Sequence, residues 1–168
     1  MQYMKAHGNT PGPTQRPLLN GALCGLAAGI PSCVILYFTG AFASIIAVIG
    51  LPLMIALHIT LTTVAGMVYA HIFKRAANDR TGGWLFGACS GFLFWVAGPI
   101  SIWQIATGNA VATGLAAKGI FAGSILYGLL LGILFPRVHV LIQHRLIDAL
   151  KEPPPHQKVS KEPESSRG

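Results

Sequence analysis

Histidine is the side chain of this sequence that could do chemistry inside a membrane. His58 lies within a long stretch without charged residues, and His71 follows thirteen residues later, about 20 Å along a helix. That spacing would suit two haem groups stacked across a membrane, each iron held by paired histidines. A second helix would have to supply the partners, and beyond Pro136 it offers only His139 and His144. His139 could face His71, but nothing completes His58, so we expect no bound cofactor and keep haem as the weakest alternative.

The other residue types give little sign of catalysis. Cys24, Cys33 and Cys89 form no CxxC pair, so they are predicted to be small apolar packing residues. Asp and Glu are absent from every predicted membrane segment, whereas ion-coupled pumps and exporters use a buried carboxylate to carry the coupling charge. The sequence also lacks metal-ligand spacings, a phosphate-binding loop and a nucleophile elbow. We therefore predict a protein that is not an enzyme and binds no metal.

The composition defines the environment in which these residues work. The chain has 168 residues, of which 52% are hydrophobic and only 10% are charged, and its mean hydropathy is +0.57. Soluble domains carry about 25% charged residues. The composition excludes a soluble globular enzyme, a disordered chain and a disulfide-stapled secreted domain. It predicts an all-α integral membrane protein.

Charge-free stretches divide the chain into membrane spans. Residues 17–73 contain no Asp, Glu, Lys or Arg. This stretch is too long for a single span, which needs about 20 residues. Pro52 suits the first turn of a second helix. The transmembrane domain, residues 17–136, is therefore predicted to be a four-helix bundle. Its predicted spans are about 17–38, 52–73, 84–104 and 118–136.

The flanking segments have different compositions. Residues 1–16 and 153–168 are predicted to be disordered tails, the second following three consecutive prolines. Residues 137–152 alternate apolar and polar side chains at helical spacing, which predicts an amphipathic helix along the membrane interface. Residues 41–49 are too short to cross a bilayer, and we expect them to dip into the outer leaflet or pack over the bundle.

The distribution of basic residues predicts the orientation. Lys and Arg precede the first span, separate the second from the third, and follow the fourth, whereas the other two linkers hold only Lys118. By the positive-inside rule both termini face the cytoplasm, and the protein lies in a plasma membrane. The net charge of +7 belongs mostly to these flanks, so we expect contact with lipid headgroups and no nucleic-acid partner.

Glycines at four-residue spacing predict how the helices pack. In lipid, close backbone approach and interhelical hydrogen bonds replace the hydrophobic effect. The predicted packing residues are Gly21, Gly25, Gly29, Gly66, Gly87, Gly91, Gly128 and Gly132. The predicted polar intramembrane residues are Asn20, His58, Thr62 and Ser124. Bundle assembly is the favoured interpretation of the glycine faces, with homo-oligomerisation as the alternative.

The glycine pattern also suggests an internal duplication. An offset of sixty-six residues places Gly21 on Gly87, Gly25 on Gly91 and Gly66 on Gly132. It predicts two helix pairs of the same orientation, which is the parallel kind of repeat.

The chain resembles a group of small four-span bacterial inner-membrane proteins of the domain-of-unknown-function type. The resemblance covers residues 17–136. It rests on His58, Gly66, Tyr69, Gly83, Gly87, Trp95, Pro99, Tyr127, Gly128 and Gly132. The group's pattern has a second histidine three residues before the last Tyr-Gly pair, where this chain has Ser124. The resemblance implies a bacterial inner membrane and no particular activity.

These observations lead to three functional hypotheses. The first is a non-enzymatic accessory or scaffold subunit that acts through helix–helix and lipid contacts, in a homo-oligomer or a larger membrane complex. The second is a passive carrier or channel for a small solute, with a polar path through Asn20, His58 and Thr62. The third is the b-type haem protein. For His58 we favour a structural role, with its ring donating to a neighbouring helix at Asn20 or Ser124.

Overall fold

The described part of the chain consists of helices and short connections and contains no strand, which confirms the predicted fold class. The computed structural model describes residues 16–73, 82–108 and 113–151, with side chains described up to residue 142. Its helices are α2 (Pro17–Phe38), α3 (Ala43–Ile49), α4 (Leu51–Phe73), α5 (Gly83–Val96), α6 (Pro99–Ala106) and α7 (Gly114–Lys151). Four segments are long and apolar enough to span a membrane, namely Pro17–Phe38, Leu51–Phe73, Gly83–Ala106 and Gly114–Ile142.

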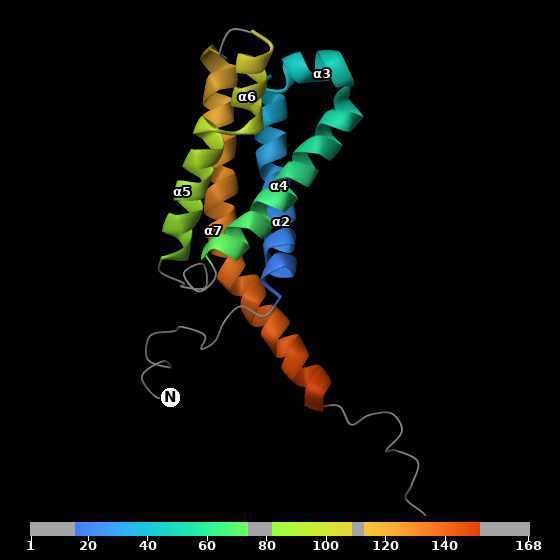
Figure 1. Ribbon diagram of the computed structural model, residues 1–168, viewed down its shortest axis with the longest axis vertical. Coiled ribbons are helices and arrows are strands. Elements are labelled where there is room, and N and C mark those ends of the chain that lie inside the picture. The colour runs from blue at the N-terminus through green and yellow to red at the C-terminus, as the bar shows by residue number, and fades with distance from the viewer. Residues whose placement is uncertain (1–15, 74–81, 109–112, 152–168) are drawn as a thin grey trace, which may run out of the picture.

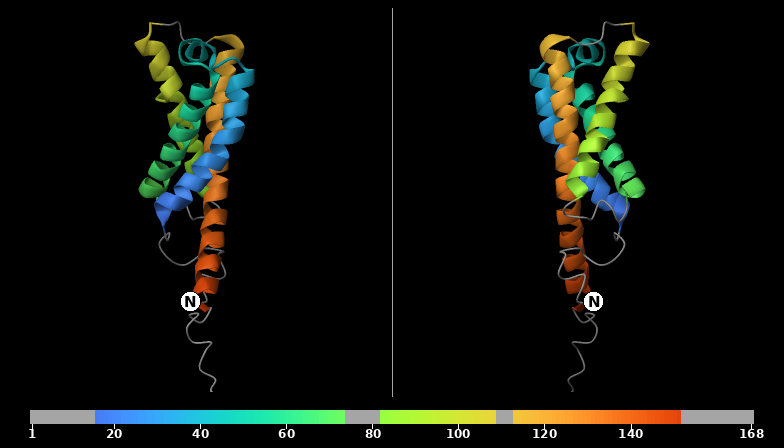
Figure 2. Two further views of the ribbon diagram at one scale, coloured as in Figure 1. Left: turned by 90° about the vertical axis from the view of Figure 1, so that its right-hand side faces the viewer. Right: turned by 90° about the vertical axis from the view of Figure 1, so that its left-hand side faces the viewer.

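The helices form two antiparallel pairs (Figures 1 and 2). α2 packs against α4, α5 packs against α7, and α2 and α7 join the two pairs. The short helices α3 and α6 lie at one end of the bundle, which we call the distal end. α2 begins and α7 leaves the bundle at the opposite, proximal end. In each pair the first helix runs from the proximal to the distal end and the second runs back, and a short helix at the distal end joins the two.

The third predicted span is broken in two. α5 ends at Val96, and α6 begins at Pro99. Pro99 has no backbone N–H to continue a helix, and the residue before a proline is driven out of the α region. Gly98 accordingly adopts an extended conformation with φ −76° and ψ 165°.

The fourth predicted span and the predicted interfacial helix run together as the single helix α7. Pro136 lies inside it and removes only one helical N–H. Figure 1 shows α7 continuing past the proximal ends of the other helices and away from the bundle. Residues 1–15 and 153–168 of the two predicted tails lie outside the described residues, as does residue 152 of the predicted interfacial helix.

Glycines bring each helix pair into backbone contact. A Cβ atom on Gly66 of α4 would collide with the carbonyl oxygen of Gly21 and lie 2.8 Å from Cα of Gly25. In the second pair, a Cβ atom on Gly128 would collide with the carbonyl oxygen of Gly87 and lie 2.6 Å from Cα of Gly91. In both pairs the obstacle is backbone, which no rotamer change can move away.

The contacts establish the repeat but correct its register. Gly21 and Gly25 correspond to Gly87 and Gly91, as the offset of sixty-six predicts. Gly66, however, contacts Gly21 and Gly25, whereas Gly128 contacts Gly87 and Gly91. Gly66 therefore corresponds to Gly128 and not to Gly132. The second half is therefore four residues shorter between its long helices. Four residues are about one helical turn, so the same helix face is kept.

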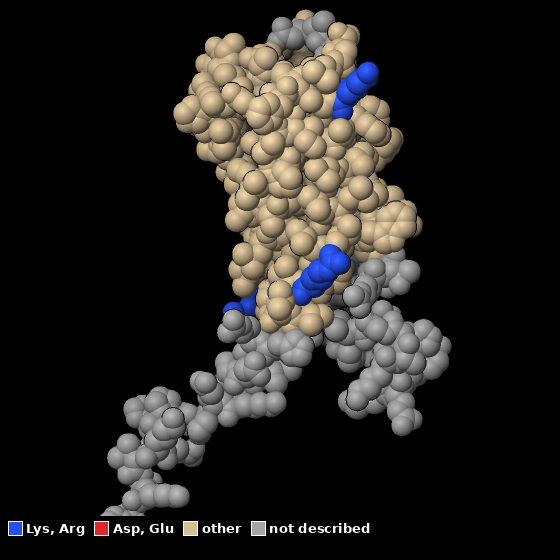
Figure 3. All heavy atoms as spheres, turned by 180° about the vertical axis from the view of Figure 1, so that it is seen from behind, with Lys and Arg blue, Asp and Glu red and all other residues tan. Residues whose placement is uncertain are grey.

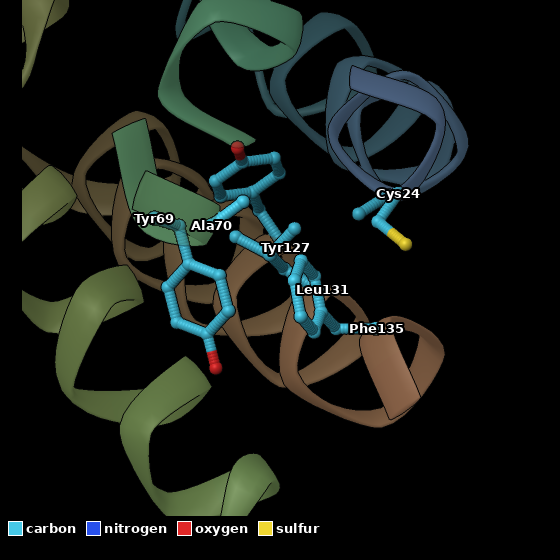
Figure 4. Packing of buried hydrophobic residues seen from close by; sticks show 7 residues of the cluster. Cys24, Tyr69, Ala70, Tyr127, Leu131 and Phe135 are labelled. Atoms are coloured by element: carbon cyan, nitrogen blue, oxygen red, sulfur yellow. The ribbon is translucent and has the colours of Figure 1, made fainter. Parts of the chain in front are cut away.

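Two groups of buried apolar residues fill the bundle. The proximal cluster joins α2, α4 and α7 and is seen closely in Figure 4; it consists of Cys24, Ala28, Tyr69, Ala70, Tyr127, Leu131 and Phe135. The distal cluster lies under α3, and consists of Leu36, Ala41, Phe42, Ile45, Met54 and Ile120. The segment at residues 41–49 thus packs over the distal end of the bundle, which is the second of the two placements expected for it.

The outer surface is apolar between two charged ends (Figure 3). Among the residues whose side chains are described, the only charged ones are Arg16, Lys118 and Arg137. Large apolar side chains such as Phe38, Val68 and Leu93 are exposed between them. In water such a surface would be unfavourable, and in lipid it is the ordinary exterior of a membrane protein.

We predict that Gly128→Ala destabilises the bundle by about 1–3 kcal/mol, because the new methyl group must force two backbones apart. Gly66→Ala should have an effect of similar size in the other pair. The measurement is the loss of helical circular dichroism when SDS is titrated into protein in mild detergent. Ala122→Leu is the control, since it adds more volume at an exposed position of α7. Equal stability of Gly128→Ala and the control would contradict the backbone contact.

Candidate functional site

Asn20 links α2 to the proximal part of α7. Its side-chain amide donates to the carbonyl oxygen of Phe135 at 3.3 Å. Its own side-chain oxygen accepts a weak bond from the thiol of Cys24 at 3.6 Å. Asn20 is fully buried, so both halves of its amide are used inside the protein. It therefore serves as a fixed interhelical connection.

Two tyrosine hydroxyls make the other interhelical connections of the proximal half. Tyr127 of α7 donates to the carbonyl oxygen of Thr62 on α4 at 2.7 Å. Tyr69 of α4 donates to the carbonyl oxygen of Gly83 at the start of α5 at 3.3 Å. Figure 4 shows the two rings pointing in opposite directions from neighbouring helices. Sequence reasoning did not single out these hydroxyls, although both tyrosines belong to the quoted resemblance.

Thr62 uses its hydroxyl within its own helix. The hydroxyl donates to the carbonyl oxygen of His58 at 3.0 Å. The residue is 1% exposed and packs against Gly29 of α2. Thr62 is thus part of the helix contact and does not present its hydroxyl to a path.

His58 connects the middle of the two helices of the first pair. Its Nε2 donates to the carbonyl oxygen of Gly29 at 3.2 Å. The ring also meets Phe42 edge-on, with centroids 5.3 Å apart. The ring therefore does donate to a neighbouring helix, but the acceptor is a backbone carbonyl and neither Asn20 nor Ser124.

The other two haem candidates lie far from His58. His71 is thirteen residues along the same helix and is exposed. His139 is fifteen residues beyond Ser124 on α7, about 22 Å away from the level of His58. His139 is fully buried, and neither ring nitrogen has a hydrogen-bond partner. The structure thus brings no second described histidine to His58.

A cavity of about 180 Å³ lies in the distal half of the bundle, beneath α3 and beside His58. We call it the distal cavity. Its lining comes from every described helix, and consists of Ser32, Leu36, Ile45, Ile49, Met54, Leu57, His58, Leu61, Phe94, Gly98, Pro99, Ile100, Ser101, Trp103, Ile120 and Ser124. The walls are mostly apolar, and a few polar groups converge on them, as is typical of small-molecule sites.

The position of the distal cavity follows from the packing of the four long helices. α4 packs on α2 and α3 but has no extensive contact with α5 or α6. Figure 1 shows α4 diverging from α6 toward the distal end. The cavity occupies this fork, with α2 and α7 behind it. Sequence reasoning missed it, although it named three of its lining residues, His58, Pro99 and Ser124.

The distal cavity does not continue through the bundle. On its proximal side lie the glycine contacts and the proximal cluster, whose members are at most 3% exposed. The three residues of the predicted polar path, Asn20, His58 and Thr62, all use hydrogen bonds inside the bundle. The cavity is therefore a pocket with a closed proximal end.

The cysteines and other metal-binding residue types form no cluster within the described ranges. Cys24 is buried, Cys33 is partly buried and Cys89 is exposed, and all three are free. No group of three or more His, Cys, Asp or Glu side chains comes together among the described residues.

Comparison with known proteins adds no further assignment. No family model, curated protein or solved structure matches this chain. The fold and the site therefore define the class: a multi-pass helical membrane protein, built from two glycine-packed helix pairs, with one apolar pocket described in its distal half.

We predict that Tyr127→Phe lowers the stability of the bundle by about 0.6 kcal/mol, up to about 1.7 kcal/mol, which is the range for hydrogen bonds between membrane helices. The change removes the bond to Thr62 and leaves the ring in place. Tyr37→Phe is the matched control, because Tyr37 is exposed near the distal end of α2. The same SDS titration measures both, and a control as unstable as Tyr127→Phe would refute the assignment.

Proposed function

We propose that this chain is a non-enzymatic accessory or scaffold subunit of a bacterial inner membrane, which acts through helix–helix and lipid contacts. The observation that carries the proposal is the way its polar groups are used. The side chains of Asn20 and Tyr127 donate to backbone carbonyls of neighbouring helices, so they hold helices together, and the Thr62 hydroxyl donates to the His58 carbonyl within α4. The outer faces of the bundle carry exposed apolar side chains between the charged ends, and these side chains can contact lipid or another membrane protein.

The proposed orientation has both termini in the cytoplasm. Arg16 lies where α2 begins at the proximal end, and Arg137 follows the proline of α7. Lys74, Arg75 and Arg80 belong to the sequence that joins α4 to α5 at the same end. Lys118 is the one described cation near the distal end, so the excess of basic residues supports a cytoplasmic proximal end.

Reporter fusions in a bacterial host test this orientation. A fluorescent protein that folds only in the cytoplasm should be active when it is fused after residue 168. Alkaline phosphatase, which is active only outside the cytoplasm, should be active when inserted after Gly108. Phosphatase activity at the C-terminal fusion and none at Gly108 would reverse the proposed topology.

Purification from native membranes tests the accessory role. In mild detergent we expect the chain to co-purify with a larger membrane protein or with further copies of itself, identified by native mass spectrometry. The absorption spectrum should lack a Soret band, whereas a Soret band that His58→Ala removes would favour the haem alternative. A monomer that carries a small solute across liposomes, in a manner weakened by His58→Ala, would overturn the accessory role.

The carrier remains the second candidate, because the distal cavity places His58 at the wall of a solute-sized space. Its closed proximal end means that transport would require the proximal cluster to separate. Phe135 and Tyr69 meet edge-on within that cluster, with ring centroids 5.7 Å apart, so their contact is one of those that would have to break.

A further inference from the structure

Four polar groups on residues that line the distal cavity have no hydrogen-bond partner among the described residues. They are the hydroxyls of Ser32 on α2 and Ser124 on α7, Nδ1 of His58 on α4, and the indole Nε1 of Trp103 on α6. Ser32 is 2% exposed and Ser124 is 7% exposed, yet neither hydroxyl has a partner within the described part of the chain. Polar groups inside a protein are nearly always paired, so an occupant of the cavity with hydrogen-bonding groups of its own would complete them.

The hydrogen bond at Nε2 determines what His58 presents to the cavity. Because the Gly29 carbonyl can only accept, Nε2 must carry a proton. In a neutral imidazole the other nitrogen is then a bare acceptor. Nδ1 therefore requires a donor, whereas the two serine hydroxyls can either donate or accept. A hydroxyl group on the occupant satisfies both, since it donates to Nδ1 and accepts from a serine.

The rest of the lining determines the body of the occupant. No lining residue carries a fixed charge, so the occupant is uncharged. Side chains such as Leu36, Ile45, Met54, Phe94 and Ile120 form the walls. An apolar cavity of about 150 Å³ holds a benzene ring, so this space of about 180 Å³ accommodates a six-membered ring with a substituent.

The access route runs from the lipid. Leu57 lines the cavity on α4 and is 43% exposed, so the cavity reaches the surface of the bundle there. α4 diverges from α6 toward the distal end (Figure 1), and Leu57 belongs to a segment long and apolar enough to lie in lipid. A ligand that enters by this route must be soluble in the bilayer, and an alkyl tail can remain in lipid.

We propose that the distal cavity binds a lipid-soluble phenol, with its hydroxyl against His58 Nδ1 and the hydroxyls of Ser32 and Ser124, and its alkyl tail toward the lipid between α4 and α6. This site is independent of the accessory role, which rests on the interhelical hydrogen bonds of Asn20 and Tyr127 and on the apolar exterior of the bundle.

Photolabelling of the full chain in phosphatidylcholine vesicles tests the site. The probe is 4-octylphenol with a diazirine beside the ring, and the comparison probe is the corresponding methyl ether, which cannot donate. Adducts are located by mass spectrometry. We expect the phenol to label lining residues such as Leu57 and Ile100 about threefold more than the ether does, because the ether oxygen can still accept from a serine and only the intramembrane hydrogen bond donated to His58 Nδ1 is lost. Excess unlabelled 4-octylphenol should suppress these adducts.

Variants separate the polar groups from the shape of the cavity. The double variant Ser32→Ala and Ser124→Ala should reduce the phenol adducts about tenfold, while its stability stays unchanged because neither hydroxyl has a protein partner. Ser90→Ala is the control, since Ser90 donates to the Phe86 carbonyl on α5 and does not line the cavity. Equal labelling by phenol and ether, adducts only at lipid-facing positions such as Val68, or no effect of the double variant would each overturn the proposal.

Discussion

Backbone contact between glycines is the constraint on which this structure depends. In lipid, two helices gain little by hiding apolar side chains from one another, so their attraction must come from close packing and hydrogen bonds. Gly66 against Gly21 and Gly25 provides that approach in one pair, and Gly128 against Gly87 and Gly91 provides it in the other. The hydroxyl of Tyr127 can reach a backbone carbonyl of α4 only because α2 and α7 hold the two pairs together.

The distal cavity is the counterpart of this close proximal packing. Where the glycines end, side chains stand between the helices: Gly29 already meets the side chain of Thr62 in place of a backbone. Beyond that level α4 diverges from α2, and α3 fills the space between them with Phe42 and Ile45. A helix pair that is narrow at one end and wide at the other leaves room for a pocket only at its wide end. The cavity therefore follows from the distribution of glycine along the helices.

Much of this architecture was predictable from the sequence, because it depends on local composition. Charge-free length located the four spans, and the glycine spacing identified the faces that pack. One fixed offset could not predict how the second half aligns with the first. The segment from Gly91 to Gly128 is four residues shorter than the segment from Gly25 to Gly66, and only the contacts between glycines reveal this difference. The cavity was also beyond prediction, because it depends on the angle between α4 and α6. The burial of His139 depends likewise on neighbours from other helices, and its polar side chain had suggested a place at the interface.

From the sequence, His58 could be either a structural or a functional residue. The geometry gives its two ring nitrogens different roles. Nε2 is used by the carbonyl oxygen of Gly29, a bond between α2 and α4 just where the glycine contact weakens. That bond fixes the tautomer of the neutral ring and so makes Nδ1 a hydrogen-bond acceptor. A side chain that only joined helices would not need to face a cavity shared with Ser32 and Ser124. In the proposed site the structural bond thus also prepares the other nitrogen for the phenol hydroxyl, because without it the imidazole could present either a donor or an acceptor.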